Sequence, residues 1–119
     1  MKVVNVEQVP KVPLNTPLFT SPDVSIQPLA PEGSAYSMSV VTFGKGVRNK
    51  FHAHESDQIL IVTAGRGIVA TEDEEREVTT GDVILFAAGE KHWHGATENS
   101  EFSHIYVHLA GAGTKQLEE

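Results

Sequence analysis

The feature that most constrains the fold of this chain is a series of short β-type runs that begins at Ser37 and is punctuated by glycines. The runs are rich in Val, Ile, Thr and aromatic residues, and they read SMSVVTF, QILIVTA, GIVAT, EVTT, DVILF and SHIYVHL. Strands of this length at short spacing are typical of an all-β sandwich or barrel. No stretch keeps helical periodicity for more than about two turns. The sequence therefore predicts one all-β domain, which also suits a length of 119 residues.

The N-terminal part differs, because all six prolines lie within residues 10–31. Proline fixes φ and lacks a backbone donor, so this segment cannot form a helix or a central strand. We predict an extended arm over residues 1–34, with a short edge piece at Val24 to Gln27. Three placements stay open for this arm: along the domain, along a second subunit, or free as a flexible tail.

The remaining chain divides into two parts. The β-type runs predict a barrel over residues 35–110. The closing segment AGAGTKQLEE is small and polar, which predicts a flexible tail over residues 111–119.

Composition excludes several classes of function. Lys and Arg total 9 against 16 Asp and Glu, which gives a net charge of −7. Binding to nucleic acid or to an anionic membrane surface needs clustered positive charge, so neither is an expected partner. The chain has no cysteine and therefore no disulfide framework or thiol nucleophile. No apolar run approaches the roughly 18 residues of a membrane span, and the N-terminus lacks a signal-peptide pattern, so we expect a cytoplasmic protein.

Candidate ligands gather in the second half of the chain, where all six histidines lie. Side chains at positions i and i+2 of a strand point to the same face. The histidines therefore form three stripes: His52 with His54, His92 with His94, and His104 with Tyr106 and His108. Gln58 has the same parity as the first stripe.

Three imidazole-rich faces are hard to place in solvent, because the opposite faces would then have to supply the whole core. A small β-barrel with a partly polar interior accommodates all three. Imidazoles crowded in a low-dielectric interior need partners, and a divalent transition metal ion supplies one. The alternative is a hydrogen-bonded histidine cluster without metal.

Two segments resemble the paired motifs of the cupin family of small β-barrels. GVRNKFHAHESDQILIVTAG, residues 46–65, matches the first motif at every spacing, with Gln58 where the family usually has glutamate. GDVILFAAGEKHWHGA, residues 81–96, matches the second, with alanines in place of its proline and asparagine. The resemblance covers about residues 37–109. It implies a cupin barrel of jelly-roll type, with a metal ion held by His52, His54, Gln58 and His92.

The chain also resembles a narrower group of bacterial single-domain cupins that includes manganese-dependent hydroxynitrile lyases. The matching pieces are HAHESDQILIVTAGRG, GDVILFAAGEKHWHGA and SHIYVHLA. This resemblance implies glutamine as the usual fourth ligand and manganese as the first expected metal, with Fe, Ni, Co or Zn as alternatives. It also implies that His104 matches the catalytic base of the lyases.

The expected function is a metal-dependent lyase that acts on a small carbonyl or hydroxyl compound, with a cyanohydrin-like molecule as one candidate. The metal would act as a Lewis acid, and His104 or His94 would move a proton. Two alternatives stay open. One is a metal-dependent dioxygenase, since a set of histidines on Fe(II) can bind dioxygen. The other is a small-ligand-binding or sensing module without turnover.

Other polar residues have simpler interpretations. Glu55 and Asp57 are expected on the loop surface. Arg48 and Lys50 share the parity of His52, so they either anchor an anionic substrate at the cavity mouth or form a solvated pair.

We also expect a homodimer. If the histidines face inward, then Ile105, Val107 and Leu109 form an outward apolar patch on the last strand.

Overall fold

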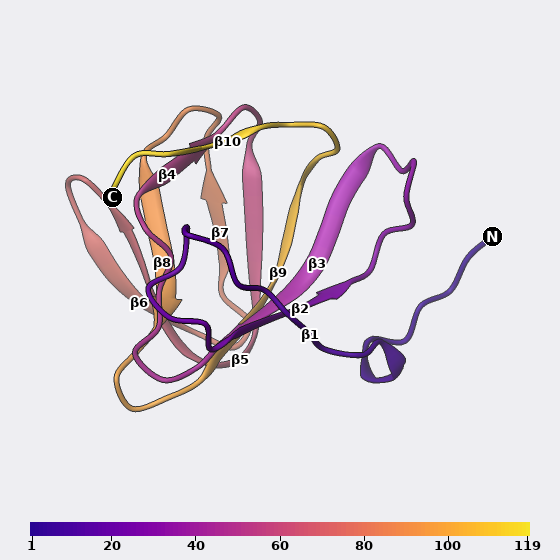
Figure 1. The fold of residues 1–119 in the computed structure, drawn as a ribbon, viewed down its shortest axis with the longest axis horizontal. Helices are drawn as coiled ribbons and strands as arrows, with labels where there is room; N and C mark the ends of the chain where they lie inside the picture. The colour runs from indigo at the N-terminus through magenta and orange to yellow at the C-terminus, as the bar shows by residue number, and fades with distance from the viewer.

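Ten β-strands and one 3₁₀ turn make up the computed structural model, which describes residues 1–119 (Figure 1). In chain order the elements are η1 (Val6–Gln8), β1 (Val12–Pro13), β2 (Val24–Pro28), β3 (Tyr36–Phe43), β4 (His52–His54), β5 (Gln58–Thr71), β6 (Glu75–Thr79), β7 (Val83–Phe86), β8 (His92–Ala96), β9 (Phe102–Leu109) and β10 (Thr114–Gln116). The prediction of an all-β fold is confirmed. No helix here has the length and apolar character that crossing a membrane would require.

The strands form one curled antiparallel sheet in the order β1-β2-β3-β9-β5-β8-β4-β10, and β6 and β7 also pair with β5. β5 organises this sheet, because its first residues pair with β7 and β9 while its second half pairs with β6 and β8. The register shifts between Val62 and Ala64. A bulge of this kind bends a strand. The bend turns the sheet around an interior, which Figure 1 shows between β3 and β9 on one side and β4 and β8 on the other.

Alternate residues at the start of β5 and of β9 point to the interior, as the alternation of side chains in a strand requires, whereas β3 is buried over residues 39–43. Leu60 and Val62 on β5 are fully or almost fully buried, and so are Phe43 on β3 and Phe102 on β9. The ring centroid of Phe43 lies 5.8 Å from that of His104. The apolar core therefore packs directly against the histidines.

The proline-rich arm packs on its own barrel. The expected edge piece is present as β2, which pairs with β3 so that Val24 lies opposite Phe43. Further along, the carbonyl oxygen of Leu18 accepts a hydrogen bond of 2.7 Å from the backbone N–H of Lys50. Of the three placements that the sequence left open, the structure therefore shows the arm along its own domain.

The C-terminal segment differs from the flexible tail expected over residues 111–119. Thr114–Gln116 form β10, which pairs antiparallel with β4 and places Thr114 opposite His54. Glu118 then accepts two hydrogen bonds from Arg48. These contacts join residues far apart in the chain, so local composition could not reveal them. The sheet extends beyond residues 35–110 at both ends, since β2 and β10 belong to it.

Candidate metal centre

Two short strands and the start of a third bring four predicted ligands together. His52 and His54 lie on β4, and His52 is paired with His92 on β8. Gln58 is the first residue of β5. All four side chains are buried. One ring nitrogen from each histidine lies within 4.8 Å of the corresponding nitrogens of the other two, so the three could hold a metal ion.

Hydrogen bonds behind the rings fix which nitrogen faces the centre. The Nδ1–H of His52 donates to the carbonyl oxygen of Lys50 at 2.6 Å, and the Nδ1–H of His92 donates to that of Glu90 at 2.8 Å. A carbonyl oxygen only accepts, so each neutral ring carries its proton on Nδ1 and a lone pair on Nε2. Partners of this kind orient the histidines of metal sites.

The inward-facing Nε2 atoms of His52 and His92 are acceptors, because both protons lie on Nδ1. The Oε1 of Gln58 lies 3.2 Å from the Nε2 of His92, which has no proton to share if Nδ1 carries it. The Nε2 of His54 is buried and has no hydrogen-bond partner. Buried lone pairs that face one another without a proton are unfavourable, and a cation between them would remove the cost. Imidazole and amide donors suit a divalent transition metal ion.

The protonation state of the three histidines also favours metal binding at neutral pH. Burial, together with the neighbouring His92, lowers the pKa of His52 to about 4. Burial is also the main cause that lowers the pKa of His54 and that of His92 to about 4. The three rings are therefore neutral at pH 7, which is the form that binds a metal.

A cavity of about 240 Å³ opens onto this centre. Leu14, Leu18 and Phe19 of the arm line one side of it, together with Phe43 from the core. None of the lining residues is a Lys, Arg, Asp or Glu. The cavity therefore suits a neutral molecule with an apolar body.

His94 and His104, the predicted proton-transfer residues, lie in the wall of the same cavity. Their ring centroids are 4.8 Å apart and their planes are nearly perpendicular. Both are almost fully buried. Burial lowers the pKa of His104 to about 4 and holds the pKa of His94 well below its usual range. Both rings are thus neutral at pH 7.

Arg48 and Lys50, the two basic residues before His52, lie outside the wall of the cavity. Arg48 forms an ion pair of 2.7 Å with Glu118, and its guanidinium stacks over the ring of Trp93 at 4.4 Å. Neither Arg48 nor Lys50 lines the cavity, so the anchor for an anionic substrate, one of the two alternatives expected for this pair, is absent from its wall. The expectation assumed that the strand of His52 continues back through these residues, whereas β4 begins at His52.

The loop and stripe residues lie as expected. Glu55 and Asp57 are exposed. Tyr106 and His108 line the cavity beside His104, and their rings stack with centroids 5.1 Å apart. The third polar stripe therefore faces the interior.

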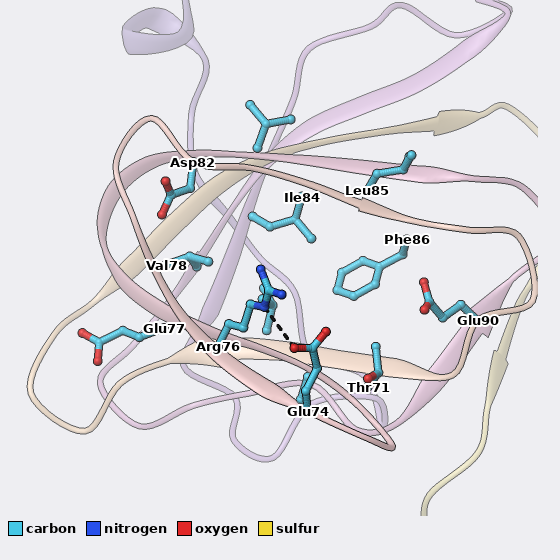
Figure 2. Close-up of a pocket in the computed structure, with 13 residues that line it drawn as sticks. Thr71, Glu74, Arg76, Glu77, Val78, Asp82, Ile84, Leu85, Phe86 and Glu90 are labelled. Carbon is cyan, nitrogen blue, oxygen red and sulfur yellow. Dashed lines mark hydrogen bonds and ion pairs between the residues drawn. The ribbon is translucent and has the colours of Figure 1, made fainter.

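A larger cavity of about 510 Å³ is lined mainly by residues of β5, β6 and β7 (Figure 2). Val78, Ile84 and Phe86 form its apolar side, and the ion pair of Glu74 and Arg76 lies at its rim. It contains no histidine. The ring of Phe86 stacks on that of His92 with centroids 3.8 Å apart, so this ring adjoins both the larger cavity and the cluster. The chemistry of the site lies in the smaller cavity.

Sequence reasoning missed several residues of the site. Thr114 hydrogen-bonds the Nδ1 of His54 at 2.8 Å, and Asn49 contacts His94. Leu14, Leu18 and Phe19 of the arm close one side of the cavity. No local pattern marks Thr114 or the arm residues, because they reach the site from distant parts of the chain. Asn49 lies within the first motif segment, but its contact is with the distant His94.

Comparisons with known proteins agree with this geometry. The family model described as Cupin domain matches residues 39–108. An (R)-mandelonitrile lyase from Granulicella tundricola is 41% identical over 87 residues, which are 71% of this chain and 66% of that protein. The chain therefore spans about two thirds of the length of that relative.

Solved structures share the fold. A cupin-like protein from Thermotoga maritima superposes with a TM-score of 0.83 at 27% identity, over 90% of this chain and 84% of that one. The polyketide cyclase RemF from Streptomyces resistomycificus has a TM-score of 0.87 at 17% identity, over 100% of this chain and 87% of that one. The second likeness concerns the fold alone.

Proposed function

Because this chain belongs to the cupin domain family, we propose that it is a metal-dependent lyase that cleaves a small neutral cyanohydrin into a carbonyl compound and hydrogen cyanide. One observation carries the proposal. Three buried neutral histidines converge beside a cavity whose wall also holds the imidazoles of His94, His104 and His108 and no Lys, Arg, Asp or Glu. The (R)-mandelonitrile lyase of Granulicella tundricola supports the choice of reaction.

The metal would be a single divalent transition ion, with manganese as the first candidate and Fe, Ni, Co or Zn as alternatives. His52, His54, Gln58 and His92 would hold it. When bound, such an ion supplies Lewis-acid polarisation of a substrate oxygen. Because Gln58 contributes no negative charge, the site keeps more of the cation's charge than one with a carboxylate ligand.

The chain's own residues would move the proton. A buried, neutral His104 accepts the hydroxyl proton of the substrate, and the O–H electron pair becomes the second bond of the carbonyl group. The carbon–carbon bond to the nitrile breaks, and cyanide leaves with its electron pair. Cyanide then takes the proton from His104, so hydrogen cyanide forms and the ring returns to its neutral state.

The cavity supports the choice of a neutral substrate. Its apolar wall comes from the arm and the core, including Leu18, Phe19 and Phe43. A carboxylate or phosphate group would find no cationic side chain there. An aromatic or aliphatic cyanohydrin has an apolar body and one polar carbon, which matches the distribution of polar groups around the cavity.

The test is turnover of (R)-mandelonitrile by the Mn²⁺-loaded protein, followed as benzaldehyde and hydrogen cyanide. We expect the wild type to cleave it, and His104→Gln to lose at least about 100-fold in kcat with unchanged metal content. No cleavage of this or of aliphatic cyanohydrins would overturn the proposal. Oxygen consumption by the Fe(II)-loaded protein would then indicate a dioxygenase, and ligand binding without turnover would indicate a sensing module.

We further propose that the protein acts as a homodimer. The outward face of the sheet carries Ile59, which lies opposite Leu85 on β7 and Val107 on β9. Leu85 and Leu109 are more than half exposed, at 63% and 52%. A continuous apolar face of this kind is typical of an isologous interface. The cytoplasmic location stays a prediction.

A further inference from the structure

The side chain of Asn49 is buried and contacts His94 with both ends of its amide. Its Oδ1 accepts a hydrogen bond of 2.8 Å from the backbone N–H of His94. Its Nδ2 lies 3.2 Å from the Nε2 of the same histidine. The backbone N–H can only donate, so it fixes the amide with Oδ1 toward the backbone and Nδ2 toward the ring.

The orientation of Asn49 determines the tautomer of His94. An amide NH₂ group only donates, so the Nε2 of His94 must accept. A neutral imidazole carries one proton, which then lies on Nδ1. His94 therefore presents an N–H donor at Nδ1, and its other nitrogen is occupied by Asn49.

Gly95 allows this close contact. The segment before β4 bridges to β8 at Arg48 and Gly95, and the backbone N–H of Asn49 donates to the carbonyl oxygen of His94 at 3.0 Å. A Cβ at Gly95 would meet the Cα of Arg48 at 2.4 Å, which no real contact tolerates. Glycine is therefore required for Asn49 to reach the imidazole.

The donor at Nδ1 has no partner within the protein. The Nδ1 of His94 is buried and unpaired, and so are both ring nitrogens of His104. These two rings are neighbours in the wall of the cavity, with centroids 4.8 Å apart. An unpaired buried donor beside an imidazole with a free acceptor calls for a ligand that satisfies both.

We propose that Asn49 is a positioning residue that fixes His94 as a hydrogen-bond donor to the substrate and leaves His104 as the only base. This inference rests on the proposed lyase function. His94 cannot serve as the base, because Nδ1 already carries a proton and Nε2 is bonded to Asn49. Its Nδ1–H is suited to a substrate atom that gains negative charge as the carbon–carbon bond breaks, next to the hydroxyl group whose proton His104 removes.

The test uses Asn49→Asp, which keeps the shape of the side chain but replaces the NH₂ donor by an acceptor. One carboxylate oxygen retains the backbone N–H of His94, and the other draws the ring proton to Nε2. Long-range ¹H–¹⁵N correlation spectra report the tautomer of each histidine. They would be recorded on the full chain, both metal-free and loaded with diamagnetic Zn²⁺. The exposed Asn99→Asp is the control for the added negative charge.

We expect His94 to carry its proton on Nδ1 in the wild type and in Asn99→Asp, and on Nε2 in Asn49→Asp. With the donor lost, kcat for cyanohydrin cleavage by Asn49→Asp should fall about 100-fold. A wild-type spectrum with the proton on Nε2 would overturn the assignment of the tautomer. A switched tautomer with unchanged kcat would overturn the donor role.

The outcomes separate this inference from the proposed function. If the wild type cleaves no cyanohydrin, the function fails, while the spectra still decide whether Asn49 sets the tautomer. If Asn49→Asp does not fold, Asn49→Ala serves instead. Without the amide, the spectrum of this variant should show a mixture of the two His94 tautomers, and a pure Nδ1–H form would contradict the role of Asn49.

Discussion

Thr114, on the last strand, hydrogen-bonds the Nδ1 of His54 at 2.8 Å. The histidine is a proposed metal ligand on β4, and the threonine lies opposite it on β10. The hydroxyl of Thr114 orients the ring of His54, as backbone carbonyls orient the rings of His52 and His92. The C-terminal segment is therefore part of the support of the metal centre.

We predict that Thr114→Val weakens metal binding about 10-fold, because outer partners of ligating histidines typically contribute 10- to 100-fold in metal affinity. The substitution keeps the β-branched shape and removes only the hydroxyl. Competition with a chromogenic chelator measures the affinity. Thr63→Val, at an exposed position of β5, is the matched control and should leave it unchanged. Equal affinities for the two variants would refute a role for Thr114.

Gln58→Glu should bind the metal more tightly and turn over more slowly. A carboxylate adds a negative charge that attracts the cation and also reduces its Lewis acidity. We expect about a 10-fold rise in affinity, and a fall in kcat, in the same chelator competition and cyanohydrin assays. Gln8→Glu, at an exposed residue of η1, controls for net charge. A carboxylate variant with weaker metal binding would contradict the assignment of Gln58 as a ligand.

The metal-free protein should lose stability as the pH falls from about 6.5 to 4. Burial lowers the pKa of His52, His54, His92 and His104 to about 4, below the ordinary histidine value of about 6.5. Between these values the unfolded chain binds protons that the folded chain does not. Each such proton lowers the free energy of unfolding by about 1.4 kcal/mol per pH unit.

Urea unfolding of the metal-free protein at pH 7, 6 and 5 measures this dependence. His104→Gln removes one of the titrating groups, so its slope should be shallower than that of the wild type. Equal free energies of unfolding at pH 7 and pH 5 would show that the interior histidines are not kept neutral by burial.

Ile59→Glu should convert the proposed dimer into a monomer. Ile59 is 38% exposed on the outward face, so a charge there is tolerated by the single barrel but not by an apolar interface. Light scattering after size-exclusion chromatography gives the mass. Val12→Glu changes another exposed residue, on the arm, and should stay dimeric. A monomeric wild type would remove the basis of the dimer proposal.

Strand periodicity accounts for what the sequence could predict. Because side chains two apart share a face, the pairs His52 with His54 and His92 with His94 had to point the same way once each lay on a strand. The spacing to Gln58 follows from the family motif. The short runs and the glycines between them indicated a barrel. In the structure the two histidine pairs and Gln58 are buried in its interior.

The rest of the site depends on contacts between distant segments. Parity fails at Arg48 and Lys50, because the chain before His52 bridges to β8 and the arm instead of extending β4. Asn49 reaches His94 only because Gly95 permits a close approach. Thr114 and Phe19 come from the two ends of the chain, which look polar or proline-rich and carry no strand signal of their own.

Elemental analysis decides whether His52, His54, Gln58 and His92 hold one metal ion. The full chain would be purified without an affinity tag or chelator and compared with His52→Ala. We predict about one equivalent of Mn, Fe, Ni, Co or Zn in the wild type and its loss from a folded His52→Ala. A wild type without metal that also takes up none on loading would contradict it.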